Sequence, residues 1–364
     1  MTLLLATKWL LGASFALWAL LTFFVVVRKY GRDRREARST QRRALLERLA
    51  RDGDVDELAE VLRPAARDLD AQVDVDAAIA RVRPDLNAYR LARVRAAAHA
   101  SGLESALVDQ LGDRDPVARG EAALVLARLG HQLATHRIAG LLSDRDPDVR
   151  LAACRALALL ATQQGAEALI AALAERQMPP ERIVERLAAP WALQATLDAL
   201  ANATSSLPVE APARGAGRAI PFRASLARAL GLVGDPRAGS ALLQLLRGGS
   251  EEEQVNAARA LGEVGSDEAP RALVDALGSA SWPVRAQAAT ALGALGSSEA
   301  VPALAECLGD GAWWVRANAA GALRALGPSG LNALRQALDS EDRYARERAG
   351  EALALEGLRT GAAA

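Results

Sequence analysis

The chain has 364 residues, of which 51% are hydrophobic but only 4% aromatic, and its 44 basic side chains balance its 44 acidic ones. This length exceeds one average domain, so it favours several units or internal repeats over a single core. The two cysteines, Cys154 and Cys307, lie in alanine-rich stretches of the sequence, as is typical of small buried residues. They do not form a CxxC pair, which argues against a cysteine-based metal site.

The first predicted element is a membrane-spanning helix over residues 9–27, within an N-terminal anchor of residues 1–27. The stretch WLLGASFALWALLTFFVVV contains no charged residue, and as a helix it would be about 28 Å long, close to the thickness of a bilayer core. It ends in Phe-Phe-Val-Val-Val, a poor site for signal peptidase, so an uncleaved anchor is favoured over a signal peptide.

A basic juxtamembrane segment follows over residues 28–43, with eight basic and two acidic side chains, whereas only Lys8 lies on the other side of the apolar run. Because positive flanks stay in the cytoplasm, the N-terminus is expected outside and the rest of the chain at the cytoplasmic face of a bacterial inner membrane. The segment is either a plain stop-transfer flank or a second contact to anionic lipids. All basic residues except Lys8 and Lys29 are arginines, a bias that fits a GC-rich genome.

Residues 44–85 are predicted to form two short helices around Asp52-Gly53-Asp54, followed by a less regular acidic stretch. This pattern indicates a helical linker or an atypical N-terminal cap. A cap is expected because the end face of a repeat stack would otherwise be apolar.

The remainder, residues 86–358, repeats one phrase, Val-Arg-x-x-Ala-Ala-x-Ala-Leu-Gly, mostly at a spacing of 31 residues. Copies start at Val149, Phe222, Glu253, Val284 and Val315, and weaker ones at Val94, Ala118 and Ala345. Apolar residues recur every three or four positions, and Gly296 follows such a run, so each unit is predicted to be a helix, a turn and a second helix. The fold class is therefore all-α, a right-handed solenoid of about nine two-helix repeats, with a loop insertion at 204–219 and a tail at 359–364.

The phrase Asp146-Pro147-Asp148-Val149-Arg150, with Ala152-Ala153 and Ala156-Leu157, resembles the HEAT-repeat family, in particular the short type of phycobilin lyase subunits. The resemblance implies a ladder of aspartate and arginine side chains between neighbouring repeats. Its arginines would be Arg119, Arg150, Arg223, Arg285, Arg316 and Arg346, and its aspartates Asp115, Asp146 and Asp342. Ser250, Ser281 and Ala312 replace the aspartate elsewhere, so the ladder is expected to be interrupted in the middle of the solenoid.

No motif of a known catalytic site is found. His131 and His136 are five residues apart, the chain contains no GxGxxG, GxxxxGK[ST] or GxSxG, and we expect neither enzymatic activity nor a cofactor. Residues 44–364 carry 35 basic against 42 acidic side chains, a net charge of −7 that argues against nucleic-acid binding. A lyase-like factor that attaches a chromophore or cofactor is the alternative function, and a DNA-associated solenoid is a third hypothesis.

The aromatic residues point to a partner protein. Trp282 and Trp313 occupy the same repeat position, and Trp314 and Tyr344 share the next one. They are expected at the turns between units, where they either bind a partner, as tryptophan and tyrosine often do, or close the turns. The sequence thus favours a single-pass, membrane-tethered scaffold or adaptor that binds another protein without catalysis.

Overall fold

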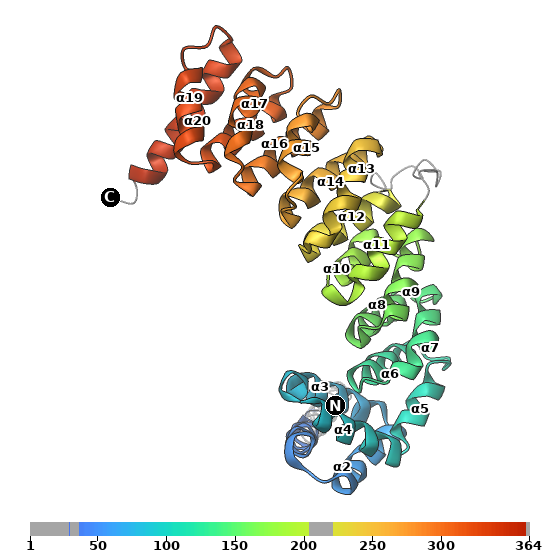
Figure 1. Cartoon of the computed structure of the whole chain (residues 1–364). Coiled ribbons are helices and arrows are strands. Elements are labelled where there is room, and N and C mark those ends of the chain that lie inside the picture. Colours follow the sequence, from blue (N-terminus) through green and yellow to red (C-terminus); the bar gives the residue numbers. More distant parts are fainter. Residues whose placement is uncertain (1–28, 30–35, 204–220, 362–364) are drawn as a thin grey trace, which may run out of the picture. The chain divides into compact units, whose positions relative to one another are not determined.

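The computed structural model describes residue 29 and residues 36–203 and 221–361, and within these ranges the chain is helical and contains no strand. The all-helical prediction is confirmed for these residues. The chain divides into two compact units, one that ends at Ala134 and one that begins at Thr135 (Figure 1).

From residue 36 on, unit 1 consists of a helix over residues 36–52 followed by shorter helices. These are α2 (Val55–Leu62), η1 (Arg63–Ala66), α3 (Leu69–Val82), η2 (Arg83–Asp85), α4 (Ala88–Ala100), α5 (Leu103–Gln110), α6 (Pro116–Arg128) and η3 (Gln132–Ala134). Within the unit, α2 packs on α4, and α3 and α5 both pack on α6.

The helix over residues 36–52 runs through the boundary that the sequence predicts between a juxtamembrane segment and a cap at residue 44. Its side chains surround the buried Asp74 of α3, which is 3% exposed and accepts hydrogen bonds from Ser39, Arg42 and Arg43. The Arg42 Nη1 and Arg43 Nε atoms lie 3.1 and 2.7 Å from the Asp74 carboxylate. The end of the basic segment is therefore part of unit 1, because its arginines neutralise a buried carboxylate there.

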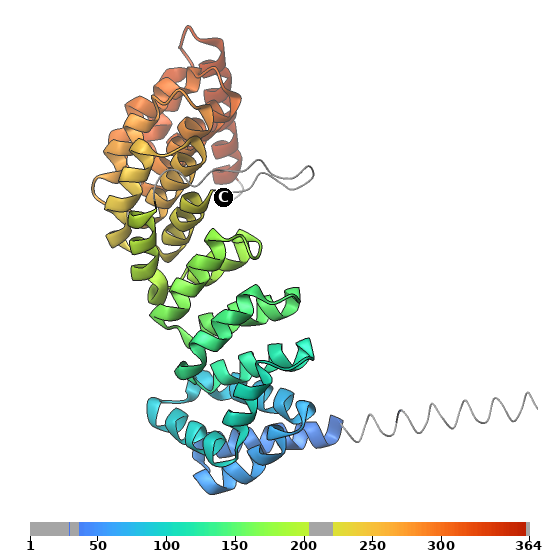
Figure 2. The same cartoon turned by 90° about the vertical axis from the view of Figure 1, so that its right-hand side faces the viewer.

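Unit 2 is a stack of helix pairs (Figures 1 and 2). Its helices are α7 (Thr135–Gly140), η4 (Leu141–Ser143), α8 (Pro147–Leu160), α9 (Gln163–Ala174), α10 (Pro180–Leu187), η5 (Pro190–Ala192), α11 (Leu193–Asn202), α12 (Phe222–Val233), η6 (Pro236–Ala238), α13 (Gly239–Gly248), α14 (Glu251–Val264), α15 (Ala269–Ala276), α16 (Trp282–Leu295), η7 (Ser298–Ala300), α17 (Val301–Glu306), η8 (Cys307–Gly309), α18 (Trp313–Ala325), α19 (Pro328–Ala337) and α20 (Arg343–Gly361).

The boundary between the units falls inside the range for which the sequence predicts one continuous solenoid. It separates α6 from α7, which the 31-residue period assigns to the same repeat. The packing explains the difference, because α6 packs on α3 and α5, whereas α7 packs on α8 and α9.

In unit 2 the helices form two layers. Each even-numbered helix from α8 to α20 packs on the next even-numbered one, and α7, α9, α11, α13 and α15 follow each other in the second layer. The leucines at the same position of the repeated phrase lie between the layers, and Leu261, Leu292 and Leu323 are each 0% exposed. Neither layer buries its apolar face alone, so stacking supplies the stability of the unit.

Glycine ends the first helix of several pairs. Gly234, Gly265 and Gly296 follow α12, α14 and α16 with φ angles of 69°, 70° and 68°, in the left-handed region that terminates helices. The prediction that Gly296 caps its helix is confirmed.

A second set of glycines lets the even-numbered helices come close to one another. A Cβ atom on the glycine of the Ala-Leu-Gly phrase would lie 2.8–3.0 Å from the Cα atom of an alanine in the next even-numbered helix (Gly231 on Ala260, Gly262 on Ala291, Gly293 on Ala322). Glycine lowers helix propensity by about 1 kcal/mol relative to alanine, so its place inside these helices has a packing reason. In α18 the same position is occupied by Arg324.

The predicted membrane helix over residues 9–27 and the insertion at 204–219 lie outside the described residues. Among the helices that the structure does describe, none combines the length and the apolar character that crossing a membrane requires.

Candidate functional site

The loops that precede α6, α8, α16, α18 and α20 share one arrangement, built around the arginine of the repeated phrase. Its Nη1 atom donates hydrogen bonds of 2.6–3.3 Å to the carbonyl oxygens of the residues six and five positions earlier. This holds for Arg119, Arg150, Arg285, Arg316 and Arg346. Each arginine therefore closes the loop before its own helix.

A short polar side chain fixes the start of each of these loops. It lies two residues before the N-cap position and accepts a hydrogen bond from the N-cap backbone N–H, at 2.7–3.2 Å. The acceptors are Asp113, Asp144, Ser279, Asp310 and Ser340. Aspartate and serine suit this position because their short side chains bond to backbone N–H groups close by in sequence.

The predicted ladder aspartates have a different role from the one that the family resemblance implies. Asp115, Asp146 and Asp342 are N-caps, and their carboxylates accept hydrogen bonds of 3.0, 2.8 and 2.7 Å from the first-turn N–H groups of their own helices. Such caps satisfy backbone donors that no residue of the helix reaches. The structure therefore shows all three aspartates as helix caps, and their pairing with the arginines of neighbouring repeats stays a prediction.

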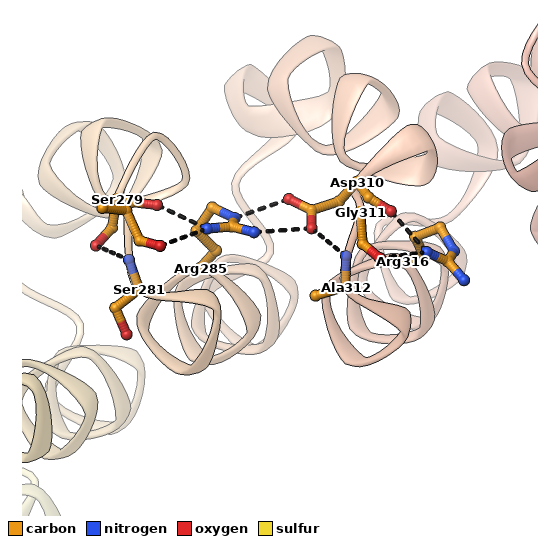
Figure 3. A network of polar contacts seen from close by, with 8 residues as sticks. Ser279, Ser281, Arg285, Asp310, Gly311, Ala312 and Arg316 are labelled. Atoms are coloured by element: carbon orange, nitrogen blue, oxygen red, sulfur yellow. Dashed lines mark hydrogen bonds and ion pairs between the residues drawn. The ribbon is translucent and has the colours of Figure 1, made fainter.

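The links between neighbouring repeats come from other acids. Arg285 of α16 donates to both carboxylate oxygens of Asp310, which precedes α18, at 2.7 and 2.9 Å (Figure 3). Arg223 of α12 lies 3.6 Å from Glu253, which also caps α14 by accepting the Ser250 N–H. The ladder thus continues at Ala312, where the sequence predicts an interruption, because Asp310, two residues earlier, supplies the acid.

The charge state of this link follows from its geometry. The hydrogen bonds from the Arg285 guanidinium, together with the Ala312 N–H, lower the pKa of the Asp310 carboxyl below its ordinary value. The same hydrogen bonds raise the pKa of Arg285. Both side chains are therefore charged at neutral pH, and they hold two consecutive loops together.

The four predicted aromatic residues lie at the first or second position of their helices rather than in the turns before them. Trp282 begins α16, Trp313 and Trp314 begin α18, and Tyr344 is the second residue of α20. Their exposed fractions are 46%, 47%, 56% and 52%, respectively. We call these four residues the aromatic strip.

Within the aromatic strip, ring contacts tie α18 to α20. The rings of Trp313 and Trp314 meet edge to face, with centroids 4.7 Å apart. The guanidinium of Arg316 lies 4.4 Å from the ring centroid of Tyr344, and that of Arg348 lies 5.3 Å from the ring centroid of Trp313. Such contacts contribute about 0.5–1 kcal/mol each at exposed positions. No ring contact to Trp282 is found in the described part of the chain, so its stacking on Trp313 stays a prediction.

The arginine slot and the aromatic strip thus form one structure, which the sequence presents as two separate patterns. Arg316 holds the loop before α18 and also lies over Tyr344 of the next repeat. The signal in the sequence is the fixed spacing, since Arg285 follows Trp282 and Arg316 follows Trp313 by three residues.

The remaining candidates show no catalytic arrangement. Glu104 lies 2.8 Å from His131 and 3.3 Å from His99, and the described residues contain no group of three or more His, Cys, Asp or Glu side chains suited to a metal ion. Burial raises the pKa of the Cys154 and Cys307 thiols to about 11, so both are protonated and poorly nucleophilic at neutral pH.

Comparisons with known proteins agree with the repeat architecture. A family model of HEAT repeats matches residues 104–201, 218–284 and 270–354, more than half of the chain. No curated protein sequence matches the chain.

Three similar solved structures have low identity. An engineered protein is 22% identical, with 86% of this chain and 98% of that chain covered and a TM-score of 0.33. Kap121p bound to RanGTP is 13% identical, with 84% and 45% covered and a TM-score of 0.37. Human deoxyhypusine hydroxylase in complex with glycerol is 22% identical, with 82% and 96% covered and a TM-score of 0.28. Likenesses of this strength concern architecture and carry no functional argument.

Proposed function

The chain belongs to the HEAT-repeat family, and we propose that it is a scaffold or adaptor that binds a partner protein through the aromatic strip of Trp282, Trp313, Trp314 and Tyr344. One observation carries this proposal. Four large aromatic side chains, each about half exposed, begin three successive even-numbered helices of a unit whose core is built mainly from alanine and leucine. Exposed tryptophan and tyrosine are the residues that most often dominate the energy of protein interfaces.

The arginine network favours binding because it holds the strip in place. The loops before α16, α18 and α20 are closed by Arg285, Arg316 and Arg346, and the first two of these loops are joined by the Arg285–Asp310 ion pair. Side chains on helix starts that are fixed in this way lose little freedom when a partner binds, which leaves more of the contact energy for affinity.

Tethering to a membrane is the second part of the proposal, and its support is in the sequence. The uncharged run at 9–27 and the basic residues that follow would place unit 1 and unit 2 on the cytoplasmic face of the inner membrane. Arg42 and Arg43 are paired with Asp74, so contacts to anionic lipid would come from the basic residues before them.

Membrane topology can be tested with a C-terminal alkaline phosphatase fusion, which is active only in the periplasm. We expect an inactive fusion in the membrane fraction and an active one when the basic residues at 28–35 are replaced by neutral ones. Activity of the unmodified fusion would reverse the proposed orientation, and its recovery from the soluble fraction would remove the tether.

The aromatic strip is tested by measuring stability and partner recovery together in Trp282→Ala and Trp313→Ala. Because Trp282 has an exposed ring and Trp313 adds only exposed ring contacts, we expect each change to cost about 1 kcal/mol of stability or less. Recovery of a crosslinked partner from native membranes should fall strongly, as it does for hot-spot residues.

The matched control is Leu292→Ala in the core of the same unit. Leu292 is 0% exposed, and its truncation should cost about 2–5 kcal/mol. If the tryptophan variants lose stability like Leu292→Ala and recover the partner undiminished, the tryptophans are structural and the aromatic strip is not a binding site.

A further inference from the structure

Beside the aromatic strip lies a groove between α18 and α20, with a volume of about 190 Å³. It is lined by four small residues, which we call its floor (Ala317, Ala320 and Gly321 on α18 and Ala352 on α20), and by Trp313 and the 56% exposed Leu355. Sites for small molecules usually measure about 300–1,000 Å³, so this groove fits one large side chain of a binding segment rather than a cofactor.

The groove exists where the repeat departs from its own packing rule. In α12, α14 and α16 the glycine of the Ala-Leu-Gly phrase lets the next even-numbered helix approach within van der Waals contact of the backbone. In α18 this position is Arg324, and its side chain lines the groove together with that of Arg348. A side chain as large as arginine cannot occupy a gap that excludes a Cβ atom, so α20 lies farther from α18 at this level and the space between them stays open.

The charge of the groove is uneven. Arg348 forms an ion pair with Glu351 at 2.8 Å and lies over the ring of Trp313, so both of these charged groups are compensated. Arg324 is half-buried, and no hydrogen bond or ion pair of its guanidinium is found among the described residues. A guanidinium at the edge of an apolar groove favours a carboxylate, which it can bind through two parallel hydrogen bonds.

From these observations we propose that the groove between α18 and α20 binds a segment of a partner protein in which an apolar side chain is flanked by an acidic residue. The apolar side chain would lie on the small floor next to Trp313 and Leu355, and the carboxylate would bind Arg324. This inference rests on the proposed protein-binding function and defines the chemistry of its partner.

The direct test is selection from a phage-displayed library of random peptides on the purified full chain. We expect the enriched peptides to combine leucine, phenylalanine or a similar side chain with a neighbouring aspartate or glutamate. Fluorescent copies of these peptides, and copies with asparagine or glutamine in place of the acids, then report affinity by fluorescence anisotropy. The neutral copies should bind about tenfold more weakly or worse.

Two variants probe the groove from independent sides. Arg324→Glu reverses its free charge and should weaken the enriched peptides at least about tenfold. Gly321→Leu fills the floor, and because nothing lies within 4 Å of a Cβ atom at this position, it fits the helix while it occupies the space of the peptide side chain. It should abolish binding without loss of thermal stability, since leucine is the better helix former.

The matched control is Arg335→Glu. Like Arg324, Arg335 lies in the last turn of its helix, but it is exposed on α19 and bonds only to Asn332 in the described structure. This variant makes the same change of charge at the end of a helix, so it should bind the peptides as the unmodified chain does.

The inference is overturned if no peptide is enriched, if the enriched peptides lack acidic residues, or if Arg324→Glu and Arg335→Glu bind equally. Binding that is lost in Trp282→Ala but kept in Arg324→Glu would leave the aromatic strip as the binding surface and remove the groove. If the full chain self-associates and Arg324→Glu dissociates it, the occupant is a second copy. A rise in affinity for the enriched peptides on deletion of residues 204–219 would identify that segment as the occupant. Self-association or this rise in affinity would each replace the proposed partner.

Discussion

At the scale of single residues, the arginine of the repeated phrase has up to three roles. It closes the loop before its own helix, it reaches an acid of the next repeat where one is placed for it, and in Arg316 it lies over an aromatic ring. The five N–H donors of the planar guanidinium allow this combination, which the single ammonium of a lysine would not. Asp115 and Asp146, at the N-cap positions before it, accept hydrogen bonds from the first turns of their own helices.

The Arg285–Asp310 pair gives a prediction at this scale. Both side chains are less than a fifth exposed, and Asp310 also accepts the Ala312 N–H. Asp310→Ala removes these bonds and leaves a partly buried guanidinium without its carboxylate, so we expect a loss of about 1.5–3 kcal/mol in urea unfolding. Asp342→Ala is the comparison, because it removes an N-cap at the edge of the stack and should cost about 1 kcal/mol.

The same pair predicts how stability depends on pH. The folded-state pKa of Asp310 is lower than its ordinary value of 3.8, so its contribution is complete above that value and is lost as the pH falls through the lowered pKa. In Asp310→Asn this contribution is absent at every pH. The difference in unfolding free energy between the unmodified chain and Asp310→Asn should therefore be constant near neutrality and shrink below about pH 4. A difference that persists unchanged in acid would contradict the assignment.

At the scale of helices, close approach between α12, α14, α16 and α18 depends on glycine. The contact of Gly293 with Ala322 is the clearest case, because a Cβ atom on Gly293 would lie 2.8 Å from the Ala322 Cα atom. Backbone atoms cannot move aside as the end of a long side chain can. The glycine positions of the repeat are therefore set by packing between helices.

We expect Gly293→Ala to destabilise the chain by about 1–3 kcal/mol, although alanine favours a helix, because the added methyl group overpacks the contact with α18. Gly321→Ala should have the opposite sign and stabilise by about 0.5–1 kcal/mol, since the space around this position is open. Thermal unfolding followed by circular dichroism measures both. Equal effects of the two changes would show that helix propensity rather than packing determines how glycine-to-alanine changes alter the stability.

At the scale of the whole molecule, two units share the chain, and the helix over residues 36–52 belongs to unit 1. A chain that begins at residue 44 lacks Ser39, Arg42 and Arg43, which are the side chains that bond to the buried Asp74. We expect it to be less stable in unit 1 than a chain that begins at residue 36, by at least about 2 kcal/mol, because the carboxylate is left buried and unpaired. Hydrogen exchange in α3 should rise, while α16 in unit 2 should be unaffected.

Asp74→Asn separates this effect from the loss of helix length. With this substitution, the stability of unit 1 should differ much less between the chain that begins at residue 36 and the one that begins at residue 44, since no buried charge remains to be compensated. If the difference between the two lengths is the same with and without Asp74→Asn, the ion pairs contribute nothing to the stability of unit 1.

The sequence by itself determines the repeat. Its 31-residue period, the three-and-four spacing of apolar residues and Gly296 as a helix cap all follow from local patterns, because helix formation and capping depend on residues close in sequence. The tertiary structure alone decided which acid meets Arg285, where unit 1 ends, and that Arg324 opens a groove. These features depend on contacts between different helices, such as that between Arg285 and Asp310, which are 25 positions apart. A shift of two residues, as between Asp310 and Ala312, decides whether a side chain lies where it can pair across repeats or at the N-cap of its own helix.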